Sequence, residues 1–184
     1  MATSTVETKT KRGLPIERNR ARRVIKAVTI NRSCEDLFRF WRRLENLTQF
    51  AKHLISIKET SPKESHWVAR SPAETTAEWD AVIIKEVQNE YLAWESKPGS
   101  EIDNAGSVRF RPAPGGRGSE VIVTLQYIPP VGTFGALVAK LYGEEPDIQV
   151  EEDLGRFKAL METGEIPTTV GQPVAETIRT GRRS

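Results

Sequence analysis

The sequence has one cysteine, Cys34, and two histidines, His53 and His66. A single thiol cannot form an intramolecular disulfide, and so few sulfur and imidazole groups leave little from which to build a zinc site. The glycine-rich segment 114–118 lacks the lysine and the strand-to-helix context of a phosphate-binding loop, so it indicates a hairpin turn. We therefore expect no metal and no cofactor.

Long apolar runs are also missing. No stretch approaches the roughly 18 to 20 uninterrupted apolar residues that span a bilayer, and the N-terminus has no apolar segment of the secretory type. We expect a soluble, cytoplasmic protein. A chain of 184 residues with 38% apolar content is large enough for one domain with a core, and a second core of that size would be hard to fit.

The net charge of +2 conceals an uneven distribution. Residues 1–26 carry 8 Lys and Arg against 2 Asp and Glu, whereas residues 27–164 carry 16 against 21. The basic arm is poor in apolar residues, so it has little to offset the entropy lost on ordering. We expect a disordered arm over 1–22, a folded domain over 23–165 and a flexible tail over 166–184.

The arm has neither interleaved aromatic residues nor a nucleic-acid reading motif, so no specific nucleic-acid partner is predicted. Contact with an anionic membrane surface or with a partner protein stays open as a role for it. The sequence does not indicate an oligomeric state.

Alternating apolar and polar residues predict strands in the middle of the chain. Apolar residues stand at every second position in four stretches, which are Trp79, Ala81 and Ile83; Leu92 and Trp94; Val108 and Phe110; and Val121, Val123, Leu125 and Tyr127. This period is typical of a sheet with one buried face. A β-branched strand over 24–30 precedes it, followed by a short helix that Ser33 caps with Asp36 three residues on, and by a second short helix over 47–53.

The end of the chain predicts a long amphipathic helix in two parts. Apolar residues recur at helical spacing in two sets, which are Phe134, Leu137, Val138 and Leu141, and Val150, Leu154, Phe157 and Met161. Pro146 and Gly143 lie between the sets, so we expect segments over 134–143 and 146–163 joined by a kink. A sheet bent around this helix would bury both apolar faces and leave a lined cavity between them.

Several segments resemble a known family. They are 24–33, Phe40-Trp41, 44–47, 78–81, Ala93-Trp94, 104–110 and 153–167. Over about residues 24 to 170 the chain resembles the bacterial polyketide cyclase/dehydrase and lipid-transport branch of the START-like (SRPBCC) superfamily. The resemblance implies an α+β helix-grip fold, in which a curved antiparallel sheet of about seven strands wraps around a long, kinked C-terminal helix and two short helices close one end.

The candidate ligand-binding residues are those whose apolar side chains should line the cavity beneath the helix. They are Trp79, Trp94, Phe110, Tyr127, Leu137 and Leu141. Large rings with a polar edge suit a flat or long apolar ligand, although most buried aromatic residues are simply core.

No catalytic residue is predicted. Glu78 and Asp80 share a strand face, but they alternate with Trp79 and Ala81, so we expect them on the solvated side. If Trp67 faces inward, His66 faces outward, and the sequence places no second titrating group beside it.

The leading hypothesis is therefore a binding or carrier protein for a hydrophobic small molecule, such as a lipid, an isoprenoid quinone or a polyketide-like aromatic. One alternative is a polyketide aromatase/cyclase that acts in the same cavity, so the sequence leaves open whether the protein is an enzyme. A second alternative is an interaction module recruited through the basic arm. The superfamily includes lipid carriers, coenzyme Q-binding proteins and aromatase/cyclases, so the fold does not decide among these.

Deletion of residues 1–20 should leave the melting temperature nearly unchanged, because a basic arm with few apolar residues adds little to a core. Thermal unfolding followed by circular dichroism would test this. A large fall in melting temperature would show that the arm is part of the folded structure.

Overall fold

The computed structural model describes residues 22–71, 75–100, 102–127 and 146–166. Residues 128–145 lie outside the described part, and with them the predicted helical segment 134–143 and its kink. The predicted arm, except for its last residue, and the predicted tail from 167 onward also lie outside it.

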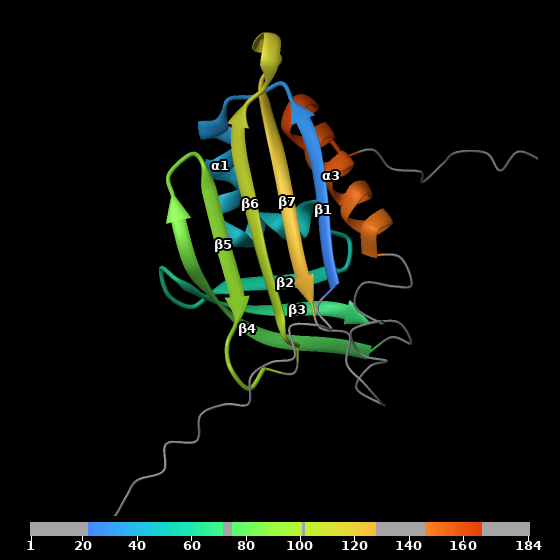
Figure 1. Ribbon diagram of the computed structural model, residues 1–184. Helices are drawn as coiled ribbons and strands as arrows, with labels where there is room; N and C mark the ends of the chain where they lie inside the picture. Colours follow the sequence, from blue (N-terminus) through green and yellow to red (C-terminus); the bar gives the residue numbers. More distant parts are fainter. Residues whose placement is uncertain (1–21, 72–74, 101, 128–145, 167–184) are drawn as a thin grey trace, which may run out of the picture.

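Seven antiparallel strands form one sheet. They are β1 (Arg22–Ile30), β2 (Leu54–Glu59), β3 (Glu64–Ser71), β4 (Thr75–Val87), β5 (Tyr91–Ser96), β6 (Asn104–Pro112) and β7 (Ser119–Tyr127), in the order β1-β7-β6-β5-β4-β3-β2. In Figure 1 the strands β1, β7, β6 and β5 run side by side, and β2 to β4 cross below them, so the sheet is strongly curved.

Helices lie against this sheet and at the tip of the β6–β7 hairpin, where η3 is found. They are α1 (Cys34–Arg42), the 3-10 helices η2 (Leu44–Gln49) and η3 (Pro114–Gly116), and α3 (Pro146–Thr163). Figure 1 shows α1 behind the sheet and α3 beside β1. This is the predicted α+β helix-grip arrangement. None of the described helices is both long and apolar enough to cross a membrane.

The first helix begins as predicted, and the second does not. The hydroxyl of Ser33 accepts a hydrogen bond from the backbone N–H of Asp36 at 3.0 Å, which caps α1. The second helix was predicted over 47–53, but it is the 3-10 helix η2, which begins at Leu44 and ends at Gln49. Leu44 and Leu47 are both buried, and a turn of three residues puts side chains at this spacing on the same side.

The predicted alternation in the sheet is confirmed. Along β4, Trp79 and Ala81 are buried, while Glu78 and Asp80 are exposed. Along β6, every second residue from Asn104 to Phe110 faces the interior. A strand sends successive side chains to opposite faces, so the inner face of the curve is almost wholly apolar.

Phe157 is the central contact of α3. Its side chain has no exposed surface. Its ring centroid lies 5.1 Å from that of Trp41 and 5.6 Å from that of Phe40, both on α1, and 4.8 Å from that of Phe50 at the end of η2. One side chain thereby joins α3, α1 and η2 in the core.

Polar contacts hold both ends of α3 against β1 and the turn after it. Near its N-terminal end, Lys26 donates to Glu151 at 2.9 Å. At its C-terminal end, Arg32 donates to the carbonyl oxygen of Met161 at 2.6 Å, and the backbone N–H of Asn31 donates to Glu162 at 2.8 Å. The hydrogen bond from Asn31, helped by Lys158, lowers the pKa of Glu162 below its usual value.

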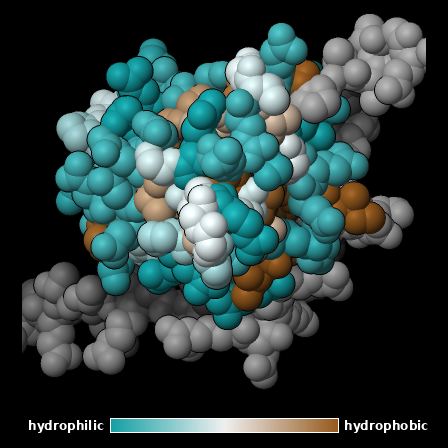
Figure 2. Space-filling model, turned by 90° about the horizontal axis from the view of Figure 1, so that it is seen from above, coloured by the Kyte–Doolittle hydropathy of each residue, from teal (hydrophilic) through white to brown (hydrophobic). Residues whose placement is uncertain are grey.

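The outer surface is mainly polar. From above, Figure 2 shows a mostly hydrophilic face on which hydrophobic residues lie in small, separate patches. The most exposed large apolar side chains among the described residues include Ile25 on β1, Ile84 on β4 and Ile148 on α3. Apolar residues exposed singly are common on soluble proteins, so these carry no functional argument.

Phe157→Ala should lower the free energy of unfolding by about 3 to 5 kcal/mol, because it empties the point where three helices meet. Chemical denaturation would measure the change. Ile148→Ala, at an exposed position of the same helix, is the matched control and should change the free energy by less than about 0.5 kcal/mol. A loss under about 1 kcal/mol for Phe157→Ala would show that this ring does not hold α3 in place.

Candidate functional site

The inner face of the sheet, η2, the start of β2 and α3 enclose a cavity. Its described lining consists of Trp41, Leu47, Phe50, Ala51, His53, Leu54, Trp67, Trp79, Trp94, Asn104, Ala105, Val123, Leu125, Val150, Asp153 and Leu154. All four tryptophans of the protein are among them. The space that the centre of a water molecule can reach is about 80 Å³. One water needs roughly 10 to 15 Å³ by this measure, so the cavity has room for several waters or one small ring.

Three of the tryptophans stack along the curve of the sheet. Trp67 on β3 and Trp79 on β4 are cross-strand partners whose ring centroids lie 5.7 Å apart, with 25° between the ring planes. Trp94 on β5 stacks on Trp67 at 6.3 Å and 17°. Three nearly parallel rings on neighbouring strands give the cavity a long aromatic wall.

A glycine makes room for one of these rings. Gly106 on β6 is the register partner of Trp94. A Cβ atom built on Gly106 would lie 2.6 Å from Cε2 of the Trp94 ring, closer than real Cβ contacts occur. The Trp94 indole can therefore lie against the backbone of β6 only because position 106 has no side chain.

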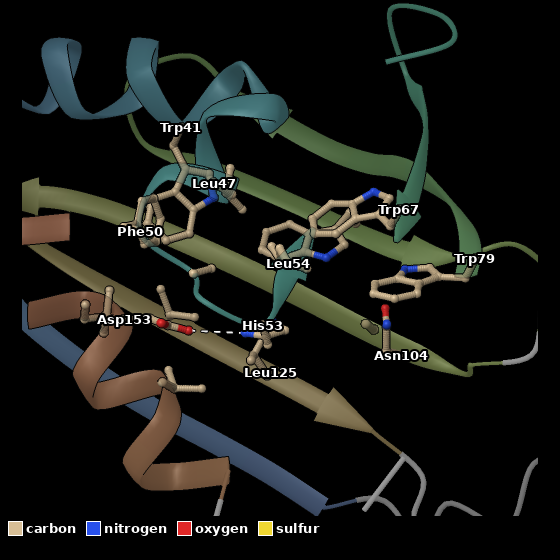
Figure 3. A pocket seen from close by; sticks show the side chains of 16 residues that line it. Trp41, Leu47, Phe50, His53, Leu54, Trp67, Trp79, Asn104, Leu125 and Asp153 are labelled. Carbon is tan, nitrogen blue, oxygen red and sulfur yellow. Dashed lines mark ion pairs between the residues drawn. The ribbon is translucent and has the colours of Figure 1, made fainter. Parts of the chain in front are cut away.

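Three of the lining residues are polar, namely His53, Asn104 and Asp153. Asp153 on α3 is only 6% exposed, and its Oδ1 accepts hydrogen bonds from the Arg156 guanidinium and from the backbone N–H of Lys52. Its Oδ2 lies 3.5 Å from Nδ1 of His53. Figure 3 shows this ion pair as a dashed line between α3 and the start of β2. Oδ1 of the buried carboxylate is thus hydrogen-bonded, and Oδ2 has the His53 imidazole as a neighbour that forms an ion pair when it is protonated.

The indole N–H groups differ in their hydrogen bonding. Nε1 of Trp67 donates to the hydroxyl of Ser65 at 2.8 Å. The buried Nε1 atoms of Trp41 and Trp79 have no hydrogen-bond partner among the described residues. Buried polar groups in proteins are normally paired, so these two donors at the cavity wall are available to a bound molecule.

The structure places the predicted ligand-binding residues in different parts of the interior. Trp79 and Trp94 line the cavity. Phe110 lies in the closed core, with ring centroids 6.0 Å from Phe38 and 6.2 Å from Trp41. It shares the inner face of β6 with Asn104, but six residues of strand put it about 20 Å farther along.

The remaining predicted residues cannot be placed in the site. Tyr127 ends β7 opposite Asn104 in the register, and its side chain is outside the description. Leu137 and Leu141 belong to the segment that the structure does not describe. Ligand contact by all six residues stays a prediction.

Several lining residues were not among the predicted set. Trp67 could have been included, because an inward orientation was one of the two that strand alternation allows for it. Asp153 stands three residues after Val150, within the apolar stripe of α3, and a carboxylate at such a position is a detectable signal. The partnership of Asp153 with His53 joins residues 100 positions apart, so no local pattern indicates it.

The predicted solvated carboxylates lie on the outer face, away from the cavity. The register of β3 and β4 pairs His66 with Asp80, and Nδ1 of His66 lies 2.9 Å from the Asp80 carboxylate. Glu78 is 3.6 Å from Nε2 of the same ring. Sequence reasoning had placed no titrating partner beside His66. All three side chains are well exposed, so this cluster contributes little to stability.

The model of a family described as polyketide cyclase/dehydrase and lipid transport matches residues 30–154. The chain belongs to this family. Membership supports a role in binding or cyclising a hydrophobic small molecule, and it does not choose between the two.

Solved structures of other proteins have a similar fold. A protein from Deinococcus radiodurans is 37% identical with a TM-score of 0.65, and the match covers 78% of this chain and 100% of that one. A Thermus thermophilus protein is 25% identical, with a TM-score of 0.58 and coverage of 73% and 92%. A START superfamily protein from Mycobacterium smegmatis, 15% identical, has a TM-score of 0.58 over 76% and 98% of the two chains and shows the fold alone. No protein with a curated functional description matches.

Gly106→Ala should displace the Trp94 ring, lower the free energy of unfolding by about 1 to 3 kcal/mol and change the tryptophan emission spectrum. Gly155→Ala is the matched control, because a Cβ there meets nothing within 4 Å. In the interior of α3 it should instead stabilise by about 0.5 to 1 kcal/mol. Equal effects of the two variants, measured by denaturation and fluorescence, would contradict the contact with Trp94.

Proposed function

We propose that this member of the polyketide cyclase/dehydrase and lipid-transport family binds and carries a hydrophobic small molecule with a flat ring system in the tryptophan-lined cavity. The observation that carries the proposal is the gathering of all four tryptophans around one cavity, three of them in a nearly parallel stack. A ring placed against such a wall gains burial at roughly 25 cal/mol per Å² and the added attraction of offset stacking.

The size of the cavity limits how the ligand enters. With about 80 Å³ of reachable space, the described walls accommodate only part of a polycyclic ligand. A larger ligand needs the lining side chains to move apart, and four of these side chains are indoles. Binding should therefore change the tryptophan fluorescence directly, so it can be detected without an added probe.

A cyclase remains the second candidate, and the His53–Asp153 pair favours it. An imidazole beside a carboxylate is a common arrangement for moving protons in a reaction. In this cavity such a pair could promote the enolisation and loss of water that ring closure requires. Incubation with a poly-β-ketone followed by mass spectrometry separates the candidates, because a cyclase/dehydrase releases a product lighter by water and a carrier returns the ligand unchanged.

Native mass spectrometry of freshly purified protein tests the carrier directly. A co-purified apolar molecule released on denaturation would support the proposal. A panel of lipids, quinones and polycyclic aromatics without saturable binding would remove its main support.

Trp94→Ala should weaken binding of an apolar aromatic fluorophore at least several-fold, because it removes one ring of the stacked wall. The wild-type protein should bind in the micromolar range or tighter, with quenching of tryptophan emission. Glu95→Gln, at the exposed neighbouring position, is the control and should bind as the wild type does. Circular dichroism would establish that both variants are folded. Equal affinities for the two folded variants would show that the ligand does not touch this wall.

A further inference from the structure

Asn104 brings an amide into a wall that is otherwise aromatic and aliphatic. It is the first residue of β6 and is 7% exposed. Its backbone N–H and carbonyl are both bonded to the hydroxyl of Ser96, at 3.0 and 3.2 Å. Its side-chain amide makes no hydrogen bond with any residue that the structure describes, although it lines the cavity. The residue keeps a small accessible surface, so its amide is available to hydrogen-bond a molecule in the cavity.

A second unpaired donor lies at the same end of the cavity. Figure 3 shows the Asn104 side chain pointing toward the indole of Trp79, across the cavity end opposite His53 and Asp153. Nε1 of Trp79 is buried and has no partner within the described part of the chain. This end therefore offers two kinds of donor, the indole N–H and the amide NH₂, and one acceptor, the amide oxygen.

The charges near the cavity limit which chemical group of a ligand can bind at the Asn104 end. No lysine or arginine is among the described lining residues. The nearby guanidinium of Arg156 is engaged by Asp153 and by the carbonyl oxygen of Phe50. A carboxylate or phosphate head group would thus enter a largely apolar cavity without a cationic partner, which is unfavourable.

We propose that Asn104, with Trp79, fixes a neutral oxygen of the ligand at this end of the cavity. The amide can donate to a carbonyl and accept from a hydroxyl. The ligand class is then a flat, neutral ring system that carries a carbonyl or hydroxyl group, in preference to a bare hydrocarbon or an anionic lipid. This inference rests on the proposed function and adds a specificity-determining residue to it.

Matched ligands test the role of the oxygen. Naphthalene, 1-naphthol, 1,4-naphthoquinone and 1-naphthoate share one ring system, and calorimetry measures their affinities without relying on fluorescence. The wild-type protein should bind naphthol and the quinone about tenfold more tightly than naphthalene, because the hydrocarbon leaves the amide and the indole unpaired. Naphthoate should bind more weakly than naphthol.

Asn104→Leu replaces the amide with an apolar side chain of similar size. It should abolish the preference for oxygenated ligands and leave the affinity for naphthalene equal or higher. Gln126→Leu, on the exposed face of the adjacent β7, is the control and should keep the wild-type preference. Trp79→Phe retains a ring but removes the N–H, so it should weaken quinone binding by a larger factor than naphthalene binding. It tests the same inference if Asn104→Leu does not fold.

The outcomes separate this inference from the proposed function. If none of the four ligands binds, the proposed function is overturned and the inference with it. If all bind with equal affinity, or if the preference survives both Asn104→Leu and Trp79→Phe, the cavity binds rings but Asn104 does not select them. Tighter binding of naphthoate than of naphthol would overturn the neutral class of ligand.

Discussion

The burial of Phe157 is the contact on which the rest of the structure depends. This ring touches Phe40 and Trp41 on α1 and Phe50 at the end of η2, so it fixes α3 against the short helices inside the curved sheet. Polar contacts at both ends of α3 then set its direction along β1. These contacts close the core at one end, and the cavity lies between the sheet and the part of α3 that carries Val150, Asp153 and Leu154.

The aromatic residues form two groups in the interior. Phenylalanines pack around Phe157 and Phe110 together with Trp41, and their rings carry no polar atom. Trp67, Trp79 and Trp94 form the stacked wall of the cavity, and each brings an N–H that must find a partner or remain costly. Trp67 finds one in Ser65, whereas Trp79 does not within the described residues. An interior built for packing alone would have little reason to place unpaired donors there.

Among the described residues, strand alternation predicted which side chains face the interior, and it could not predict how deep along the strand they lie. Trp79 and Phe110 both satisfy the period of two, yet one lines the cavity and the other is sealed in the core, because depth depends on where the helices meet the sheet. The 3-10 helix η2 was predicted three residues late, because Leu44 fits the apolar spacing of the first helix but belongs to η2. The His53–Asp153 pair joins distant segments that only the folded chain brings together.

The missing side chain at Gly106 makes the residues allowed at positions 106 and 94 depend on each other. The Trp94 ring occupies the volume that a Cβ at 106 would need, so neither residue can change freely while the other stays. Among relatives, a residue larger than glycine at this point of β6 should accompany a smaller or differently turned side chain at the position of Trp94. The width of the cavity would then be set by the residues at these two positions together. Members of the family could bind ligands of different width while the sheet and α3 stay the same.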